Sequence, residues 1–185
     1  MVPKLLALGA AAAAGYCAAS LLGRDRPKTV GFVDLARYAG TWFEIARLPN
    51  RFQDRPDMRC VDVTVTYSPM ADGTLTVVKR CRNAAQGGRE VTMEGHARSV
   101  SPGHDRLRVT FFWPAFGDDW IIALDARYRW SVVGSPDRRF LWIMARDAAL
   151  PAEDYAKALA AAGREGFDIA RLVRTAQGGT LARTA

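Results

Sequence analysis

The stretch that decides the fold is Tyr38–Arg47, YAGTWFEIAR, the first strand-like segment of the chain. Trp42 and Glu44 are two residues apart, so in a strand they point to the same face, although one is apolar and the other charged. A carboxylate on a buried face costs free energy unless it is paired or hydrated. We therefore expect Glu44 to meet inward polar groups or ordered water, or else to form a purely structural ion pair.

Strand-like segments continue from there at short, regular intervals. The clearest is RCVDVTVTY, in which valines alternate with polar residues, a pattern typical of a half-buried strand. No helix-length segment separates any two of them, which excludes a parallel sheet. The sequence predicts an all-β fold, an eight-stranded antiparallel up-and-down β-barrel, with a β-sandwich as the alternative. The predicted strands are 38–47, 59–67, 75–81, 90–100, 107–113, 119–124, 129–134 and 140–146.

One C-terminal α-helix is expected after the last strand, beginning near Pro151, a residue that the first helical turn tolerates. Its apolar stripe contains Tyr155, Leu159 and Ala162. The strand at 119–124, DWIIAL, is apolar at successive positions, as in a strand covered on both faces. We therefore predict that the helix packs on the outside of the barrel. A short extra strand is expected over 167–173.

The first 22 residues have the pattern of an export signal or membrane anchor, because one lysine precedes an uncharged stretch from Leu5 to Leu22. Three outcomes are open: lipidation at Cys17 after cleavage, cleavage after Ala19 or Ser20, or retention as an anchor. Lipidation is the preferred interpretation. The remaining chain divides into a linker over 23–31, a barrel domain over 32–176 and a flexible tail over 177–185. The expected location is the cell envelope, as an outer-membrane lipoprotein, or otherwise the periplasm or the exterior.

Cysteine usage and charge add two further expectations. In an oxidising compartment, Cys60 and Cys81 at the two ends of one predicted hairpin are candidates for a disulfide, with two free thiols as the alternative. The net charge of +7 comes from scattered arginines and lysines without a dense basic run. We interpret it as a solvated basic surface and expect no nucleic-acid partner.

An eight-stranded barrel is just wide enough to be filled by side chains or to hold one small ligand. Alternation assigns the inward positions, many of which are small or medium in size. Such a wall favours room for an apolar ligand, although a packed core remains the alternative. The inward residues are Ala46, Val63, Val65, Val77, Met93, Ala97, Val109, Phe111, Trp113, Trp142 and Met144, together with Glu44.

Residues typical of catalysis or metal binding are sparse. His96 falls on a predicted strand and His104 in a turn, without a partner at a suitable spacing. We find no Ser/His/Asp arrangement, no cluster of metal ligands and no glycine-rich phosphate loop. The expectation is a protein that is not an enzyme and that carries neither a metal nor a cofactor.

Three segments in order resemble the lipocalin family, most closely its bacterial lipocalin and apolipoprotein D branch. YAGTWFEIAR is similar to the family's Gly-x-Trp opening, IIALDARYRWSVVG to its middle motif and FLWIMAR to its closing motif. GREGFD after the helix also fits this branch, and the resemblance covers about 33–174. The corresponding structural residues are Gly40, Trp42, Asp125, Tyr128 and Arg146.

The resemblance implies a barrel closed at one end, with Arg146 packed across the ring of Trp42. It also implies a loop over the open mouth, with Phe52 and Trp113 as candidates for its rim. Arginines 47, 51 and 55 near that loop are candidates for a phosphate or carboxylate head group, or are simply exposed to solvent.

The expected function is storage or transport of a small lipophilic ligand, a fatty acid or lysophospholipid. Attachment to the membrane would come from the N-terminal lipid. A lipocalin-fold enzyme with Glu44 as its base and a tetrapyrrole or pigment binder are the alternatives. The sequence leaves both a monomer and a homodimer open.

Overall fold

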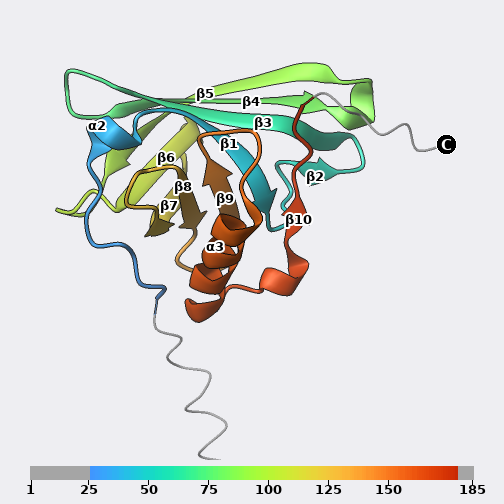
Figure 1. Ribbon diagram of the computed structural model, residues 1–185. Coiled ribbons are helices and arrows are strands. Elements are labelled where there is room, and N and C mark those ends of the chain that lie inside the picture. Colours follow the sequence, from blue (N-terminus) through green and yellow to red (C-terminus); the bar gives the residue numbers. More distant parts are fainter. Residues whose placement is uncertain (1–25, 179–185) are drawn as a thin grey trace, which may run out of the picture.

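The computed structural model describes residues 26–178. Figure 1 shows the strands curling around a common interior, with one helix beside them. The prediction of an eight-stranded antiparallel barrel is confirmed within the described residues; β2 and β10 are two-residue additions at its edge. The strands are β1 (Gly40–Arg47), β2 (Asp54–Arg55), β3 (Met58–Pro69), β4 (Leu75–Asn83), β5 (Arg89–Ser99), β6 (Arg106–Phe112), β7 (Ala115–Leu124), β8 (Trp130–Gly134), β9 (Leu141–Ala145) and β10 (Val173–Arg174).

The barrel closes through β1, which pairs on one side with β9 and on the other with β3. Trp42 lies opposite Val65 of β3, and Phe43 lies opposite Ala145 of β9. From β3 to β9 each strand pairs with the next strand in the chain. This continuous closure rules out the alternative of two separate sheets.

The closed end begins with the single helical turn α2 (Leu35–Tyr38), which the Asp34 side chain caps by accepting from the backbone N–H groups of Ala36 and Arg37. Gly40 follows with φ at +93°, a conformation that favours glycine. A Cβ atom there would also lie 3.4 Å from the Arg146 guanidinium. The glycine of the opening motif therefore allows the chain to pass from the floor into β1.

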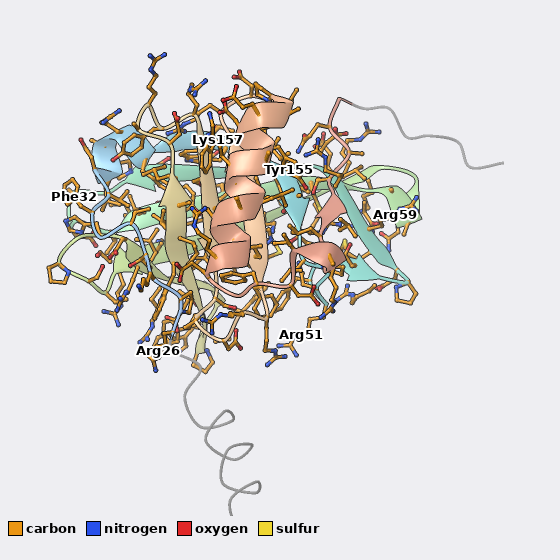
Figure 2. The ribbon with its side chains drawn as sticks, turned by 60° about the horizontal axis from the view of Figure 1, so that its bottom comes forward. Arg26, Phe32, Arg51, Arg59, Tyr155 and Lys157 are labelled. Atoms are coloured by element: carbon orange, nitrogen blue, oxygen red, sulfur yellow. A yellow bond between two sulfur atoms is a disulfide. The ribbon has the colours of Figure 1, made fainter. Side chains whose placement is uncertain are left out.

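Apolar layers lie on both faces of the barrel wall, one inside the barrel and one outside it. The inner layer lies inside the barrel and contains Trp42, Leu107 and Ile121. The outer layer contains Trp120 and Ile122 and is covered by helix α3 (Ala152–Arg164), as the DWIIAL pattern predicted. Figure 2 looks onto α3 lying across the strands. The unbroken apolar run in β7 thus has a separate partner for each face.

The segments flanking the barrel are tied to it. The Val30 N–H donates to Ile121 O, so the end of the predicted linker lies along the wall. The expected strand over 167–173 is shorter than predicted, because Ile169–Arg171 form a 3₁₀ turn and only Val173–Arg174 pair with β1. Gln177, the first residue of the predicted tail, donates to the carbonyls of Glu44 and Val63.

A disulfide joins Cys60 of β3 to Cys81 of β4. Cys17 and residues 179–185 lie outside the described residues, so lipidation and most of the predicted tail stay predictions. Within 26–178, no helix combines the length and the apolar character needed to cross a membrane.

Candidate functional site: the barrel cavity

A cavity of about 510 Å³ occupies the barrel between the Trp42 floor and the opposite end of the strands. That volume lies within the range of small-molecule sites. Its mouth is formed by the loop after β1, the β6–β7 hairpin and the β8–β9 turn. Figure 2 shows Arg51, from the loop after β1, at the edge of the molecule with its side chain directed outward.

Most of the predicted ligand-binding residues line this cavity. Val65, Met93, Phe111 and Trp142 come from four different strands and surround the same empty space instead of filling it. The barrel interior is therefore hollow between the Trp42 floor and the mouth. The predicted residues that line it are Glu44, Phe52, Val65, Val77, Met93, Val109, Phe111 and Trp142, and Met144 joins them.

Four predicted ligand-binding residues lie elsewhere. Ala46 packs in the outer layer, because a β-bulge between Glu44 and Ala46 shifts the alternation of β1. Val63 is fully buried in a small cluster with the disulfide, and Ala97 is buried within the inner layer without lining the cavity. Trp113 sits at the hairpin tip with 80% of its surface exposed. Its inward assignment is wrong because β6 ends one residue earlier, at Phe112.

Glu44 sits at the edge of the cavity and is fully buried. One carboxylate oxygen accepts from Arg47 Nη1 at 2.7 Å and from Thr175 Oγ1 at 2.6 Å. The other accepts from Gln53 Nε2 at 2.7 Å. These bonds tie β1 to the loop that follows it and to the segment after β10. Glu44 is therefore a paired structural group that combines the two outcomes expected from its position, an ion pair with Arg47 and hydrogen bonds from the polar Gln53 and Thr175.

The hydrogen-bond network around Glu44 continues through Arg47 to Asp54 and through Gln53 to Trp142. Arg47 also donates to both carboxylate oxygens of Asp54, at 2.9 and 2.6 Å. Gln53 accepts from Trp142 Nε1 at 3.0 Å, so this tryptophan is held at the cavity wall. Arg47 is 3% exposed and belongs to this network. It is therefore unavailable for the head-group role considered for it.

The other two arginines considered for a head group are exposed. Arg51 lies 5.1 Å from the ring centre of Phe52, and Arg55 pairs with Asp57. Of these two, Arg51 lines the cavity mouth.

Lys79 of β4 lines the cavity, although it was not among the residues predicted to do so from the sequence. Its Nζ lies 3.8 Å from Glu44 Oε2 and 5.5 Å from the ring centre of Trp142. Burial lowers the pKa of Lys79, and the nearby Glu44 carboxylate counteracts this shift. Its phase along the strand, two residues after the inward Val77, was the signal that could have placed it.

Asp119 of β7 is the second charged residue that sequence reasoning missed. It precedes the inward Ile121 by two residues and therefore shares its face. Burial raises the pKa of Asp119 to about 6, while the Lys79 ammonium acts in the opposite direction. Within the described residues, Asp119 makes neither a side-chain hydrogen bond nor an ion pair.

Below the cavity, a cation–π contact and several hydrogen bonds hold together the residues that form the floor of the barrel. The Arg146 guanidinium lies 3.9 Å from the ring centre of Trp42, within the range of a cation–π interaction. It also donates to the backbone carbonyls of residues 37, 38, 39 and 41. Tyr128 accepts from the Asp34 N–H, and Asp125 accepts from the Arg127 and Arg129 N–H groups. The five motif residues are structural components of the closed end.

Metal ligands do not gather anywhere in residues 26–178. His96 is exposed on β5, and His104 lies in the turn before β6. The cavity combines hydrophobic surface with charged side chains, as a binding site for an amphiphile does. The charged residues that line it are Glu44, Arg51, Lys79, Asp118, Asp119, Asp137 and Arg139.

Comparisons with known proteins agree with this architecture. The family described as "Lipocalin-like domain" matches residues 33–177. The outer membrane lipoprotein Blc of Escherichia coli (strain K12) is 38% identical over 181 residues, which cover 96% of this chain and 99% of the relative. Temperature-induced lipocalin-1 of Arabidopsis thaliana is 34% identical over 157 residues, covering 80% of this chain and 81% of the relative.

Solved structures share the fold at lower identity. Insecticyanin from the tobacco hornworm Manduca sexta superimposes with a TM-score of 0.66 at 18% identity, covering 84% of this chain and 86% of that one. Lobster apocrustacyanin A1 gives a TM-score of 0.60 at 23% identity, covering 77% and 79% of the two chains.

Proposed function

This chain belongs to the lipocalin family, and we propose that it stores or carries one lipophilic molecule, a fatty acid or a lysophospholipid, inside its barrel. The observation that carries this proposal is the cavity of about 510 Å³. Valine, methionine and aromatic side chains line it without filling it. A hollow of this kind is what a carrier needs and what a packed structural barrel lacks.

The apolar lining supplies enough free energy for the proposed ligands. Burying an acyl chain gives about 0.8 kcal/mol per methylene. Ten methylenes therefore contribute about 8 kcal/mol, which corresponds to micromolar affinity before any polar contact is counted. A medium-length acyl chain is sufficient for useful binding.

The bonding of Glu44 favours binding over catalysis. A general base needs an oxygen that is free to accept a proton from the substrate. Both oxygens of Glu44 accept short hydrogen bonds from other side chains, and the residue is fully buried. The enzyme alternative, which depended on Glu44, therefore receives no support from the geometry.

The proposed location is the cell envelope. Blc proteins that are 37–38% identical to this chain carry the name outer membrane lipoprotein. We propose the same location here, with attachment through lipidated Cys17. Metabolic labelling with a radioactive fatty acid tests this attachment: the wild-type chain should be labelled, and the Cys17→Ser variant should not.

Native mass spectrometry of the full chain purified from its own membranes tests the proposed function. The expected result is one acyl-chain amphiphile per protein, which organic extraction releases and added fatty acid or lysophospholipid restores. A visible absorbance band on the purified protein would support the pigment alternative instead. Purified chain that neither carries nor takes up any fatty acid or lysophospholipid would refute the proposal.

A further inference from the structure

On the inner wall of the cavity, away from its mouth, two charged side chains lack hydrogen-bond partners among the described residues. One is the ammonium group of Lys79 on β4, and the other is the carboxyl group of Asp119 on β7. Such groups cost free energy when they are removed from water without compensation. A ligand that fills the cavity must therefore satisfy them or bear that cost.

Lys79 requires an acceptor. Its closest anionic atom is Glu44 Oε2 at 3.8 Å, beyond hydrogen-bond distance. Glu44 already accepts from Arg47, Gln53 and Thr175. The ammonium has three N–H groups to offer, and its side chain keeps 17% exposure. A ligand carboxylate is the kind of group that it can bind with charge-assisted hydrogen bonds.

Asp119 can change its protonation state close to neutral pH. The titratable groups that act on it or share its cavity are Lys79 on β4, its neighbour Asp118, Glu44 on β1 and Tyr67 on β3, with Tyr38 of α2 at the floor and Arg51, Asp137 and Arg139 at the mouth. A second carboxylate entering the cavity would raise the pKa of Asp119 further, because like charges disfavour ionisation. Protonated Asp119 can then donate its O–H to the entering carboxylate.

The distribution of apolar side chains indicates the direction of entry. Phe52, Phe112 and Phe116 line the cavity mouth and remain 50–70% exposed. The charged pair lies further inside, in phase with Val77 and Ile121 of the inner layer. A ligand that entered tail first would place methylenes against Lys79 and Asp119. One that enters head first places its tail against the aromatic mouth.

We propose that the cavity takes up a carboxylic-acid amphiphile head first, with its carboxylate held between the Lys79 ammonium and a protonated Asp119. The complex takes up one proton from solvent, which becomes the Asp119 O–H, and no covalent bond forms or breaks. This inference rests on the proposed function. The competing arrangement leaves the head at the mouth, beside Arg51 and Arg139.

Isothermal titration calorimetry of the full chain with dodecanoate tests the proposal, at pH 7 in two buffers of different ionisation enthalpy. The two apparent enthalpies give the number of protons taken up per ligand. We expect a value close to one for dodecanoate and zero for dodecanol, which has the same tail without a carboxylate. These two wild-type measurements do not depend on any variant folding.

Three variants assign the effect to residues. Asp119→Asn should abolish the proton uptake. Lys79→Met should weaken dodecanoate by at least about tenfold, the value of one charge-assisted hydrogen bond, with little effect on dodecanol. Glu90→Gln is the control, because this exposed carboxylate of β5 lies outside the cavity lining, and it should leave the uptake unchanged.

The outcomes separate this inference from the proposed function. Dodecanoate binding without proton uptake, or uptake that survives in Asp119→Asn, would show that the head stays at the mouth and would overturn the inference alone. Preferential binding of dodecylamine would also overturn it, by showing that Asp119 binds a cation. Failure of dodecanoate, dodecanol and an added lysophospholipid to bind would instead refute the proposed function.

Discussion

Two walls of the barrel each place a carboxylate next to the same cavity, and they treat it in opposite ways. On the β1 wall, Glu44 is fully buried and accepts three hydrogen bonds of 2.6–2.7 Å. On the β7 wall, Asp119 makes none among the described residues, and burial raises its pKa to about 6. Glu44 is therefore part of the structural framework, and Asp119 is available to contact a ligand in the cavity.

This difference shows why a charged residue on an inner wall does not by itself mark a ligand contact. Glu44 attracts attention in the sequence because it follows Trp42 at strand spacing. Its partners are Arg47 of β1 itself, Gln53 of the loop after β1 and Thr175 of the C-terminal segment, so it holds that loop and that segment in place. Asp119, inside an apolar strand, makes no side-chain hydrogen bond to any of the described residues.

The largest expected effect is the removal of the partnered carboxylate. Glu44→Ala leaves Arg47 buried with one of its two anionic partners missing. Breaking a buried ion pair costs about 3–5 kcal/mol, so the free energy of unfolding should fall by that amount. Chemical denaturation measures it, with Glu90→Ala on the exposed face of β5 as the control. A loss below about 1 kcal/mol would contradict the structural role of Glu44.

Removing the Asp119 carboxylate should raise the free energy of unfolding, whereas removing the Glu44 carboxylate lowers it. Because the folded pKa of Asp119 is raised from 3.8 to about 6, the native state holds more protons than the unfolded state in this interval. Wild-type stability therefore falls as pH rises from about 4 to about 6, and the full cost of about 2–3 kcal/mol applies above pH 6.

Asp119→Asn removes that charge. The variant should be more stable than wild type at pH 8 by up to this amount, and the difference should shrink below pH 4. Urea denaturation of both proteins across this pH range measures the change. A variant that is less stable than wild type at pH 8 would show that Asp119 has a stabilising partner after all.

The smallest effect is expected outside both walls, at the hairpin tip. Trp113 is 80% exposed and contacts Phe116 edge to face. Trp113→Ala should change the free energy of unfolding by less than about 0.5 kcal/mol, as is usual for exposed sites. Thermal unfolding of the variant beside wild type is sufficient to check this. A loss of several degrees in Tm would mean that the tip packs against the barrel.

Much of the fold could be predicted because its signals are local. Alternating valines in β3 and the unbroken apolar run in β7 each depend on a few neighbouring residues. Together with the lack of a helix-length segment between the eight predicted strands, they predicted an antiparallel barrel with an outer helix and left a sandwich as the alternative. The C-terminal segment was predicted less well, because its 3₁₀ turn and short β10 depend on pairing with the distant β1.

The cavity was predicted only in part, for two physical reasons. A β-bulge in β1 shifts the alternation of inward and outward residues, so Ala46 faces outward. The sequence YAGTWFEIAR contains no signal for this bulge. Lys79 and Asp119 were passed over because a charged residue in a strand usually faces solvent. The two-residue spacing from the predicted inward Val77 could have placed Lys79. The apolar run in β7 does not alternate, so the sequence held no such signal for Asp119.

The central claim is that the ligand occupies the interior of the barrel. Met93 and Thr92 are neighbours on β5, one lining the cavity and the other exposed on the outer face. Isothermal titration calorimetry of dodecanol binding should show a loss of at least about tenfold, 1.4 kcal/mol, for Met93→Trp, which fills the cavity, and no change for Thr92→Trp. Equal affinity of both variants and wild type would place the ligand outside the barrel and contradict the account.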